Sequence, residues 1–471
     1  MKICMILEGS YPYVRGGVST WVNDILREMP QHEFIIWAIG DKEEKKGRYK
    51  VELPPNVVEV REAFLDTALK IRVKRNPNLK LKEIERKAID QLIRCENPDL
   101  NILLASFETK AINPLELFMS EAFLDIVKGV CADKFPFAGF TDLFWTIRSM
   151  FLPLLYLVGK DIPEADIYHS ASTGYAGALG ALASIKYDKP FVVTEHGIYT
   201  REREEEILIA DWVISYFKEY WISMFYMFSR FAYQEAHRVT SLFHRAKLIQ
   251  EDLGCQPDKL CVIGNGIRYQ RFEGVKPKRP DGWVDIAAIV RIAPIKDIKT
   301  MIYSFSQLKQ EIKSVRLHIL GSVNDEAYYE ECLSLIDYLG VEDIVFPGHV
   351  NILEYLEKID FTILTSLSEG QPYAVLESLA AERPLVATDV GSCRELIEGE
   401  GQDRFGPAGM FVTPMHQGDM LAALVEMCQR EKIRKRMGIA GKQRVQKYYN
   451  IDRMLQNYLD TYQEAIESWQ E

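Results

Sequence analysis

Several features that would define other protein classes are missing from this sequence. Its 471 residues include only eight cysteines, which are scattered and form no Cys-x-x-Cys pair, so zinc and a disulfide framework are disfavoured and a reducing compartment is indicated. No apolar run reaches the length of about eighteen residues that a membrane span requires. The formal charge of -11 argues against broad nucleic-acid binding. We therefore expect a cytoplasmic protein that binds no nucleic acid.

Two ligand-binding fingerprints are missing as well. The segment GSYPYVRGGVSTWV has no Gly-x-Gly-x-x-Gly pattern and so does not support dinucleotide binding. No Asp-x-Asp pair occurs in the chain, so a metal ion that clamps a diphosphate is not indicated. We therefore expect neither a metal nor a bound cofactor.

The sequence does contain an alternation of strand and helix patterns. Short apolar runs such as KICMIL, EFIIWAI, VDIAAIV and DFTILTS are separated by stretches of helical pattern, and the first run predicts a buried strand rather than a secretory signal. The alternation predicts an α/β protein with two Rossmann-like domains built on parallel sheets. We place the join in the Pro- and Gly-rich segment near residue 276, which gives domains over 1–276 and 277–450 and a final helix over 451–471.

Two segments depart from this alternation. The residues from about 61 to 160 are mostly helical in pattern, and we interpret them as an insertion in the first domain. The segment 212–231, WVISYFKEYWISMFYMFSRF, is rich in aromatic residues. It is either a buried helix pair in a large core or a docking face for a partner or a membrane surface.

Basic and glycine residues occur where parallel sheets bind ligands. Arg291 and Lys296 follow the first strand of the second domain in VRIAPIKD, where they could neutralise a diphosphate. Gly16 and Gly17 precede the first helix, where they would let the backbone approach a ligand. Each pattern by itself is also compatible with an ordinary turn or a solvated loop.

Two carboxylates lie around an expected helix start in SEGQPYAVLESLAAERPLVATDVG. Glu369 precedes the helix, Glu377 lies inside it, and Pro372 suits its first turn. Bare N–H groups at a helix N-terminus attract an anion, whereas carboxylates accept hydrogen bonds from hydroxyl groups. A ligand that is anionic in the middle and rich in hydroxyls at both ends, such as a nucleoside diphosphate sugar, satisfies both requirements.

Histidines after strands of the first domain are further candidates. His196 follows a strand in FVVTEHGIYTRE, and Gly197 beside it permits close approach of a ligand. His169 in DIYHSAS is a weaker candidate of the same kind. A histidine at the end of a strand is often structural, so both interpretations stay open.

Taken together and in this order, four motifs resemble those of retaining GT-B glycosyltransferases of family 4. They are the pair Glu369 and Glu377, the pair Arg291 and Lys296, TEHG, and RGGVSTWV. With the helical insertion and the opening MKICMILEGSYPYVRGGVSTWVNDIL, the chain is most similar to the PelF type, the cytoplasmic transferase of Pel exopolysaccharide synthases. The resemblance implies two Rossmann-like domains that face a cleft and a final helix that crosses back to the first domain.

The resemblance also implies roles for these residues. Glu369 and His196 would act at the transferred sugar as the catalytic residues, and Glu377 would bind the ribose. Arg291 and Lys296 would hold the diphosphate. The donor-binding set is completed by Gly16, Gly17, Val350 beside the base, Gly370, Tyr373 and Ala374. Ala171 stands where many family members carry a second histidine, so acceptor contacts are not carried over.

The activity implied is that of a hexosyltransferase that needs no metal. It would move a sugar from UDP-glucose or a UDP-N-acetylhexosamine to a growing polysaccharide of the Pel type, and inner-membrane synthase subunits would hold it at the membrane. Two alternatives remain. A UDP-sugar-sensing subunit without turnover would not need a complete leaving-group site. An NAD-dependent dehydrogenase shares the alternation but requires the missing glycine fingerprint.

Overall fold

The computed structural model describes residues 1–71, 79–108, 113 and 115–470. Its contacts divide the chain into two compact units. Unit 1 consists of Met1–Ser241, Lys247–Cys261 and Leu459–Glu471, and unit 2 of Leu242–Ala246 and Val262–Tyr458. On this division the join expected near residue 276 lies within unit 2, ahead of the first strand of its sheet.

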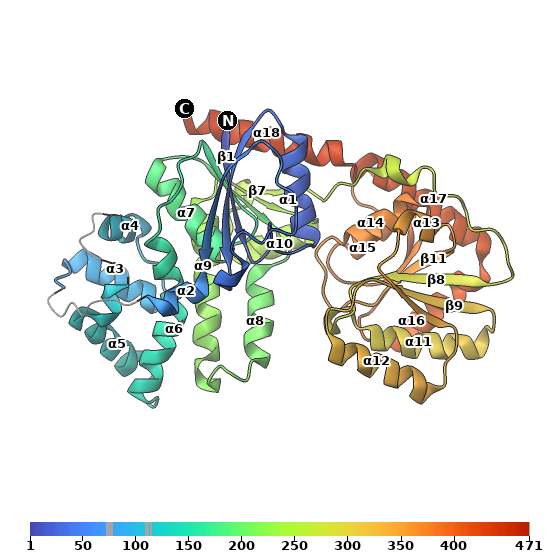
Figure 1. Ribbon diagram of the computed structural model, residues 1–471, viewed down its shortest axis with the longest axis horizontal. Helices are drawn as coiled ribbons and strands as arrows, with labels where there is room; N and C mark the ends of the chain where they lie inside the picture. Colours follow the sequence, from blue (N-terminus) through green and yellow to red (C-terminus); the bar gives the residue numbers. More distant parts are fainter. Residues whose placement is uncertain (72–78, 109–112, 114, 471) are drawn as a thin grey trace. The chain divides into compact units, whose positions relative to one another are not determined.

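A parallel sheet forms the centre of unit 1 (Figure 1). In the described part of the unit it has seven strands in the order β3-β2-β1-β4-β5-β6-β7. β1 pairs in parallel with β2 on one side and with β4 on the other. The strands are β1 (Lys2–Glu8), β2 (Glu33–Gly40), β3 (Val57–Phe64), β4 (Ile167–Ser170), β5 (Phe191–Glu195), β6 (Arg238–Ser241) and β7 (Leu260–Val262). Every residue of β4 and β5 is buried, as expected of parallel strands covered on both faces.

The range of the expected insertion, about 61–160, begins with the end of β3 and continues as helices. Residues 72–78, 109–112 and 114 of this range lie outside the described residues. The helices are α2 (Leu65–Lys70), α3 (Glu83–Ile93), α4 (Leu100–Glu108), α5 (Glu121–Lys134) and α6 (Phe140–Val158). Within the described ranges, no helix of either unit combines the length and the hydropathy required to span a bilayer.

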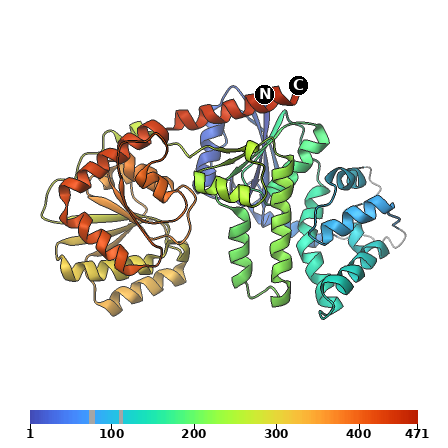
Figure 2. The same ribbon diagram turned by 180° about the vertical axis from the view of Figure 1, so that it is seen from behind.

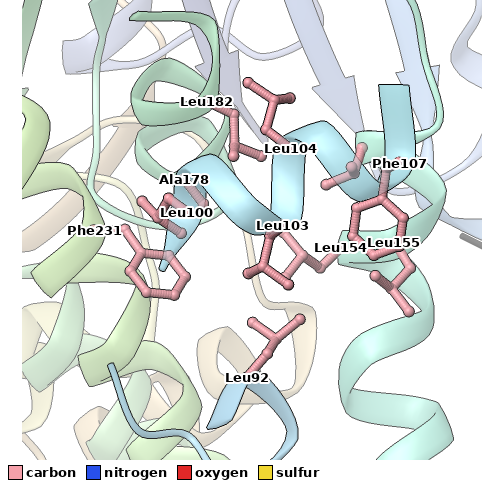
Figure 3. A pocket seen from close by; sticks show the side chains of 11 residues that line it. Leu92, Leu100, Leu103, Leu104, Phe107, Leu154, Leu155, Ala178, Leu182 and Phe231 are labelled. Carbon is pink, nitrogen blue, oxygen red and sulfur yellow. The ribbon is translucent and has the colours of Figure 1, made fainter. Parts of the chain in front are cut away.

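An apolar cavity of about 20 Å³ lies where these helices meet α7 (Tyr175–Tyr187) and α9 (Lys218–Glu235). Figure 3 shows Leu103, Leu104 and Phe107 of α4 around it, with side chains from α3, α6, α7 and α9. All its lining residues are apolar, and a space this small holds about one water molecule at most. The inserted helices therefore share one hydrophobic core with the helices that cover the sheet.

The aromatic segment 212–231 has a buried part and an exposed part. In α9, Phe225, Phe228 and Phe231 belong to the core of unit 1. Before the helix, Trp212 and Tyr216 are 69% and 52% exposed. The helix is thus core, as one interpretation held, while the exposed aromatic rings are concentrated ahead of it.

Two carboxylates at the carboxyl edge of the unit 1 sheet cap helices. Glu8 ends β1, and its Oε2 accepts the backbone N–H of Ala176 at the start of α7 at 3.3 Å. Glu195 ends β5, and its Oε1 accepts the backbone N–H of Tyr199, which begins α8 (Tyr199–Ile209), at 3.3 Å. Each carboxyl group thus occupies the positive end of a helix and satisfies one backbone N–H there.

A second parallel sheet forms the centre of unit 2. In the described residues it has six strands in the order β10-β9-β8-β11-β12-β13. The strands are β8 (Val284–Ile289), β9 (Val315–Leu320), β10 (Ile344–Gly348), β11 (Phe361–Leu364), β12 (Leu385–Thr388) and β13 (Gly409–Val412). β8 pairs in parallel with β9 and β11. The predicted α/β architecture, with two Rossmann-like domains on parallel sheets, is confirmed.

Helices alternate with these strands, as predicted, and further helices follow the last strand. The helices are α11 (Ile298–Glu311), α12 (Glu326–Leu339), α13 (Ile352–Leu356), α14 (Tyr373–Ala380), α15 (Cys393–Glu398) and, after the last strand, α16 (Gln417–Gln429) and α17 (Glu431–Tyr448). α17 contacts α14 and lies on the near side of unit 2 in Figure 2. The last helix, α18 (Ile451–Gln470), contributes residues up to Tyr458 to unit 2 and the remainder to unit 1.

An ion-pair cluster holds the amino edge of the unit 2 sheet. Asp285, the second residue of β8, is 1% exposed. It accepts hydrogen bonds from Arg316 Nε at 2.6 Å and His318 Nε2 at 2.9 Å, and it pairs with Lys278. Burial by itself would raise the pKa of Asp285, but the three donors outweigh it and hold the pKa well below its usual range. The cluster lies at the sheet edge opposite to the one where parallel sheets bind ligands.

Candidate active site

The loop between β11 and α14 leads into a helix N-terminus without a side-chain cap at the carboxyl edge of the unit 2 sheet. Pro372 is the N-cap of α14, with φ -74° and ψ 122°, so it precedes the first turn in which the sequence placed it. It provides no side-chain cap, and the first turn contains no acidic residue. No capping side chain and no acidic residue of the first turn therefore competes with an anionic ligand at this helix end.

Gly391 fixes the position of this loop from the other side. Its φ of +53° is in the left-handed region, and a Cβ there would lie 2.2 Å from the carbonyl oxygen of Glu369 and 2.4 Å from that of Gly370. The backbone N–H of Ser392 next to it donates to the Gly370 carbonyl at 3.0 Å. Only glycine allows both the conformation and the approach, so the loop is held against the segment after β12.

Glu369 is bound to Lys296 in this structure. The Lys296 ammonium lies 2.5 Å from Glu369 Oε1, and Ser366 Oγ donates to the same oxygen at 2.6 Å. Both charged side chains are largely shielded, with exposures of 15% and 10%. Lys296, predicted to hold the diphosphate, and Glu369, predicted to contact the sugar, are thus neighbours. The second carboxylate oxygen, Glu369 Oε2, accepts no hydrogen bond from Lys296 or Ser366.

Arg291 is an exposed cation two residues after the end of β8. Its guanidinium forms no hydrogen bond or ion pair with the part of the chain that the structure describes. Gly321 packs against the backbone just before Arg291: its φ is +151°, and a Cβ there would lie 2.0 Å from the Val290 carbonyl oxygen. Arg291 is therefore available to an anionic ligand at the carboxyl edge of the sheet.

Glu377 lies inside α14 in a partly buried position. Burial raises the pKa of its carboxyl group, and the nearby Arg271 opposes that rise. The helix contacts the turn Tyr269–Phe272, which carries Arg271. The predicted ribose contact of Glu377 is not tested by these interactions and stays a prediction.

Gln371 and Asn265 are site residues that the sequence interpretation missed. Gln371, in the loop before α14, accepts the backbone N–H of Asn265 through Oε1 at 2.5 Å, and its carbonyl accepts Asn265 Nδ2 at 3.1 Å. Among the described residues, Gln371 Nε2 and Asn265 Oδ1 are buried without a partner. Since 106 positions separate the two residues, no local pattern could have joined them.

The other predicted donor residues of unit 2 surround the same loop or pack nearby in its sheet. Gly370, Tyr373 and Ala374 form the loop and the first turn of α14. Val350 follows β10 and is partly buried against the apolar cluster that contains Ile359. The contacts of these four residues with the donor stay predictions.

His169 has a structural environment in unit 1. Its Nδ1 lies 2.7 Å from the Tyr462 hydroxyl, and its Nε2 lies 2.7 Å from Thr194 Oγ1. Burial, with a smaller effect of His196, lowers the pKa of His169 to about 3. Both ring nitrogens are engaged within the core, so His169 positions neighbouring groups and is not exposed to a ligand.

His196 differs from His169 in having a buried nitrogen without a partner. Its ring packs edge-on against Trp21, with centroids 4.6 Å apart. Its Nε2 is buried and has no hydrogen-bond partner among the described residues. Burial lowers the pKa of His196 to about 3, so the imidazole is neutral near pH 7. A neutral ring with an unpaired nitrogen can donate or accept one hydrogen bond to a ligand.

Gly16 and Gly17 begin α1 (Gly17–Glu28) in unit 1. Gly16 is the N-cap, without a side-chain hydrogen bond, and the first turn contains no acidic residue. The hydroxyls of Ser19 and Thr20 both donate to carbonyl oxygens, those of Val14 and Gly16. Unlike α7 and α8, α1 therefore has an N-terminus that no carboxylate occupies within the described contacts.

Solved structures share this fold. Anabaena Alr3699/HepE, solved in complex with UDP, is 16% identical, with a TM-score of 0.63 over 98% of this chain and 100% of that chain. Sucrose-phosphate synthase from Thermosynechococcus elongatus is 13% identical, with a TM-score of 0.63 over 99% of this chain and 99% of that chain. At such identities the likeness is evidence of the fold.

Curated relatives match parts of the chain. MMP alpha-(1->4)-mannosyltransferase of Mycolicibacterium hassiacum is 24% identical over 61% of this chain and 68% of its own length. Putative glycosyltransferase EpsD of Bacillus subtilis is 28% identical over 52% of this chain and 64% of its own. Putative colanic acid biosynthesis glycosyltransferase WcaL of Salmonella typhimurium is 27% identical over 37% and 43%.

The fold, these relatives and a family model described as "Glycosyl transferases group 1", which matches residues 283–430, make the protein a glycosyltransferase of the GT-B fold. Within that class the chain belongs to the family described as "Domain of unknown function (DUF3492)", whose model matches residues 1–258. The expected class is confirmed. Family 4 and the PelF type stay predictions.

Proposed function

We propose that the protein transfers a sugar from a UDP-sugar to a growing exopolysaccharide and retains the anomeric configuration. The observation that carries the proposal is the ion pair between Lys296, which follows β8, and Glu369, in the loop before α14, a helix whose N-terminus no side chain caps. The helix end suits a diphosphate, and the carboxylate suits sugar hydroxyls. UDP as the nucleotide is supported by HepE, a protein of the same fold that was solved with UDP and with UDP-glucose.

In this proposal, cations of unit 2 stabilise the leaving diphosphate without a metal. Arg291 is exposed and has no partner among the described residues, so its guanidinium can bind two phosphate oxygens at once. The Lys296 ammonium, now bound to Glu369, can also bind a phosphate that enters beside it. Positive charge placed where negative charge develops is a large contribution to catalysis.

The proposed reaction uses no side-chain nucleophile. The bond between the anomeric carbon and the diphosphate oxygen breaks, and an acceptor oxygen bonds to that carbon from the same face. The departing diphosphate oxygen takes the acceptor proton. Glu369 then stabilises positive charge on the sugar. The neutral His196, assigned to the sugar by resemblance, orients it by one hydrogen bond.

The acceptor and the partners are proposed from the resemblance to the PelF type and from the names of the relatives. WcaL is named for colanic acid biosynthesis, which supports a polysaccharide product. A Pel-type chain is the acceptor that we propose, and inner-membrane synthase subunits are the partners that would bring a cytoplasmic transferase to it.

The test is the release of UDP from candidate donors. Purified protein is incubated in EDTA with UDP-glucose, UDP-N-acetylglucosamine or UDP-N-acetylgalactosamine, with and without an oligosaccharide acceptor. We expect one donor to release UDP, faster with acceptor, and Arg291→Ala to slow the release. Lys299→Ala is the control, because Lys299 pairs with Glu331 on an exposed surface. Tight UDP-sugar binding with no turnover under any condition would favour the non-catalytic sensor instead.

A further inference from the structure

A histidine and two glutamates of unit 2 come together away from the residues proposed to bind the donor. They are His244, the first residue of α10 (His244–Asp252), Glu395 of α15, and Glu400 in the turn after α15. One ligand atom from each side chain lies within 4.8 Å of the other two. Among the described residues this is the single group of three or more such side chains with that geometry.

The arrangement is held by the backbone around it. Glu395 accepts the backbone N–H groups of His244 and Arg245, each at 3.2 Å, so its carboxylate is oriented at the start of α10. Each of its oxygens keeps a second lone pair. Glu400 follows Gly399, whose φ is +79°, and a Cβ there would lie 2.6 Å from Asp403 and 2.7 Å from Arg444. The turn thus brings Glu400 to His244 in a way that only glycine permits.

The spacing between His244 and Glu395 suits a metal ion, whereas Glu400 now contacts His244 directly and would have to move away from it to share an ion. His244 Nδ1 is 3.6 Å from Glu395 Oε2 and in closer contact with Glu400 Oε2. Ligands bound at about 2.0–2.2 Å from Zn²⁺ in tetrahedral geometry lie about 3.3–3.6 Å apart. One imidazole nitrogen with two carboxylate oxygens is a donor set for first-row divalent metals, whereas Mg²⁺ and Ca²⁺ prefer oxygen ligands alone.

A cavity with both polar and apolar lining residues adjoins the three side chains. It has a volume of about 310 Å³ and is lined by His244, Glu395 and Glu400 together with Tyr448 and other residues of unit 2. The Tyr448 hydroxyl is buried and has no partner among the described residues. The volume leaves room for water molecules to complete the coordination of an ion held by three protein ligands.

We propose that His244, Glu395 and Glu400 bind one divalent first-row metal ion, for which Zn²⁺ is a suitable probe. The site contains none of Arg291, Lys296 and Glu369, so it goes beyond the proposed function and does not depend on it. The ion ties the start of α10 to α15 and to the turn after it. His244 is 55% exposed, so an ion can reach the site from solvent.

The test is Zn²⁺ titration of the full-length protein by calorimetry after removal of metal with EDTA and desalting. We expect one Zn²⁺ per chain. His244→Ala and Glu400→Gln should each weaken binding by roughly 10–100-fold or more, since even residues that only support metal ligands cost that much when replaced. Glu400→His should keep binding, because imidazole is also a Zn²⁺ ligand.

A matched control separates this site from ordinary surface histidines. His416 Nδ1 lies 3.2 Å from Asp419 Oδ1 and pairs with this single carboxylate among the described residues. His416→Ala should therefore leave the Zn²⁺ affinity unchanged. Equal losses in His416→Ala and His244→Ala, full affinity in Glu400→Gln, or no saturable Zn²⁺ binding by the parent protein would each overturn the proposal. Far-UV circular dichroism and a cooperative thermal transition like that of the parent protein show that His244→Ala and Glu400→Gln are folded, independently of any UDP-sugar binding or turnover.

Discussion

Replacing Glu369 and replacing Glu377 by glutamine should change the kinetic constants in different ways. Glu369 is beside Lys296 in the loop, where it can stabilise charge that develops on the transferred sugar. Glu369→Gln should lower kcat by about 10²-fold or more, comparable to the loss of one preorganised donor, and should leave UDP affinity nearly unchanged. Glu377→Gln should raise KM more than it lowers kcat, because ribose hydroxyls do not change during the reaction.

Steady-state kinetics and UDP titration of both variants decide between these roles. Each glutamate serves as the matched comparison for the other, because both substitutions remove one carboxylate from the same loop and helix. If Glu369→Gln kept full turnover and lost UDP affinity, the two assignments would be reversed.

Arg291 and Lys296 should both matter for UDP, for different structural reasons. Arg291→Ala removes a free guanidinium and should weaken UDP binding by about 1.5–3 kcal/mol, the usual contribution of a hydrogen bond to a charged group. Lys296→Ala should weaken it similarly and should also lower kcat, since it leaves the Glu369 carboxylate without its ammonium partner. Calorimetry in EDTA measures the affinities, with Lys299→Ala as the control; parent-like UDP binding by both variants would place the diphosphate elsewhere.

At the scale of residues, sequence reasoning found side chains that are close along the chain or belong to a familiar motif. Glu369 and Glu377 lie in one segment of loop and helix, so a local motif contains both. Gln371 and Asn265 are joined across 106 positions, and His169 and Tyr462 across 293. Such partners depend on the packing of whole elements, which no local pattern contains.

At the scale of elements, Asp285 of β8 should make unit 2 sensitive to acid. Its pKa lies below the usual value because three hydrogen-bond donors outweigh the effect of burial, so the folded state favours the ionised carboxylate. The stabilisation is therefore complete at pH above about 3.9, the pKa of an unfolded aspartate, and is lost as the pH falls through the folded-state pKa. Asp285→Asn should lower the free energy of unfolding by about 3–5 kcal/mol at pH 7, the cost of breaking a buried ion pair.

Urea unfolding at a series of pH values measures this effect. The difference between parent and Asp285→Asn should shrink as the pH falls below about 4. Asp389→Asn is the control: its partner Arg394 is 51% exposed, and an exposed pair contributes about 0–1 kcal/mol. A difference that stayed constant down to the acid limit would mean that ionisation of Asp285 is not its source.

Helices and strands were easier to predict where nearly all of their residues are buried than where buried and exposed residues share one segment. Strands such as β1 and β2, buried along most of their length, appear in the sequence as the apolar runs KICMIL and EFIIWAI. In contrast, α9 and the segment before it form one aromatic run in sequence, although Phe228 is fully buried and Trp212 is 69% exposed. Aromatic composition alone does not distinguish a core helix from an exposed turn, because the same side chains suit both.

At the scale of the whole molecule, alternation of strands and helices was sufficient to predict two parallel α/β units. It did not give the strand order, in which β1 lies between β2 and β4 and β3 is at the edge. The alternation also did not indicate that Leu242–Ala246 belongs to unit 2, to which the contacts of these residues assign it. Pairing between distant strands is decided by how elements pack together, whereas the alternation is a local property of the chain.

Association with membrane-bound synthase subunits is a prediction for the whole protein. The exposed rings of Trp212 and Tyr216 are our candidate contacts, so Trp212→Ala combined with Tyr216→Ala should reduce sedimentation with membranes that contain those subunits. UDP binding should be unchanged. Tyr338→Ala is the control, because Tyr338 is 85% exposed on a helix of unit 2. Unfolding of the double variant would instead mean that the rings belong to the core.

Gly391 sets a rule for redesigning the choice of donor. Any other residue there would place a Cβ 2.2 Å from the Glu369 carbonyl oxygen, so the loop before α14 and the segment after β12 can only change together. A chimaera that takes the loop alone from a relative would inherit a mismatch, whereas one that takes both segments keeps the close approach. On the proposed donor site, donor preference should therefore be exchangeable as a cassette of two pieces, and Gly391 is the position that a mutant library should leave fixed.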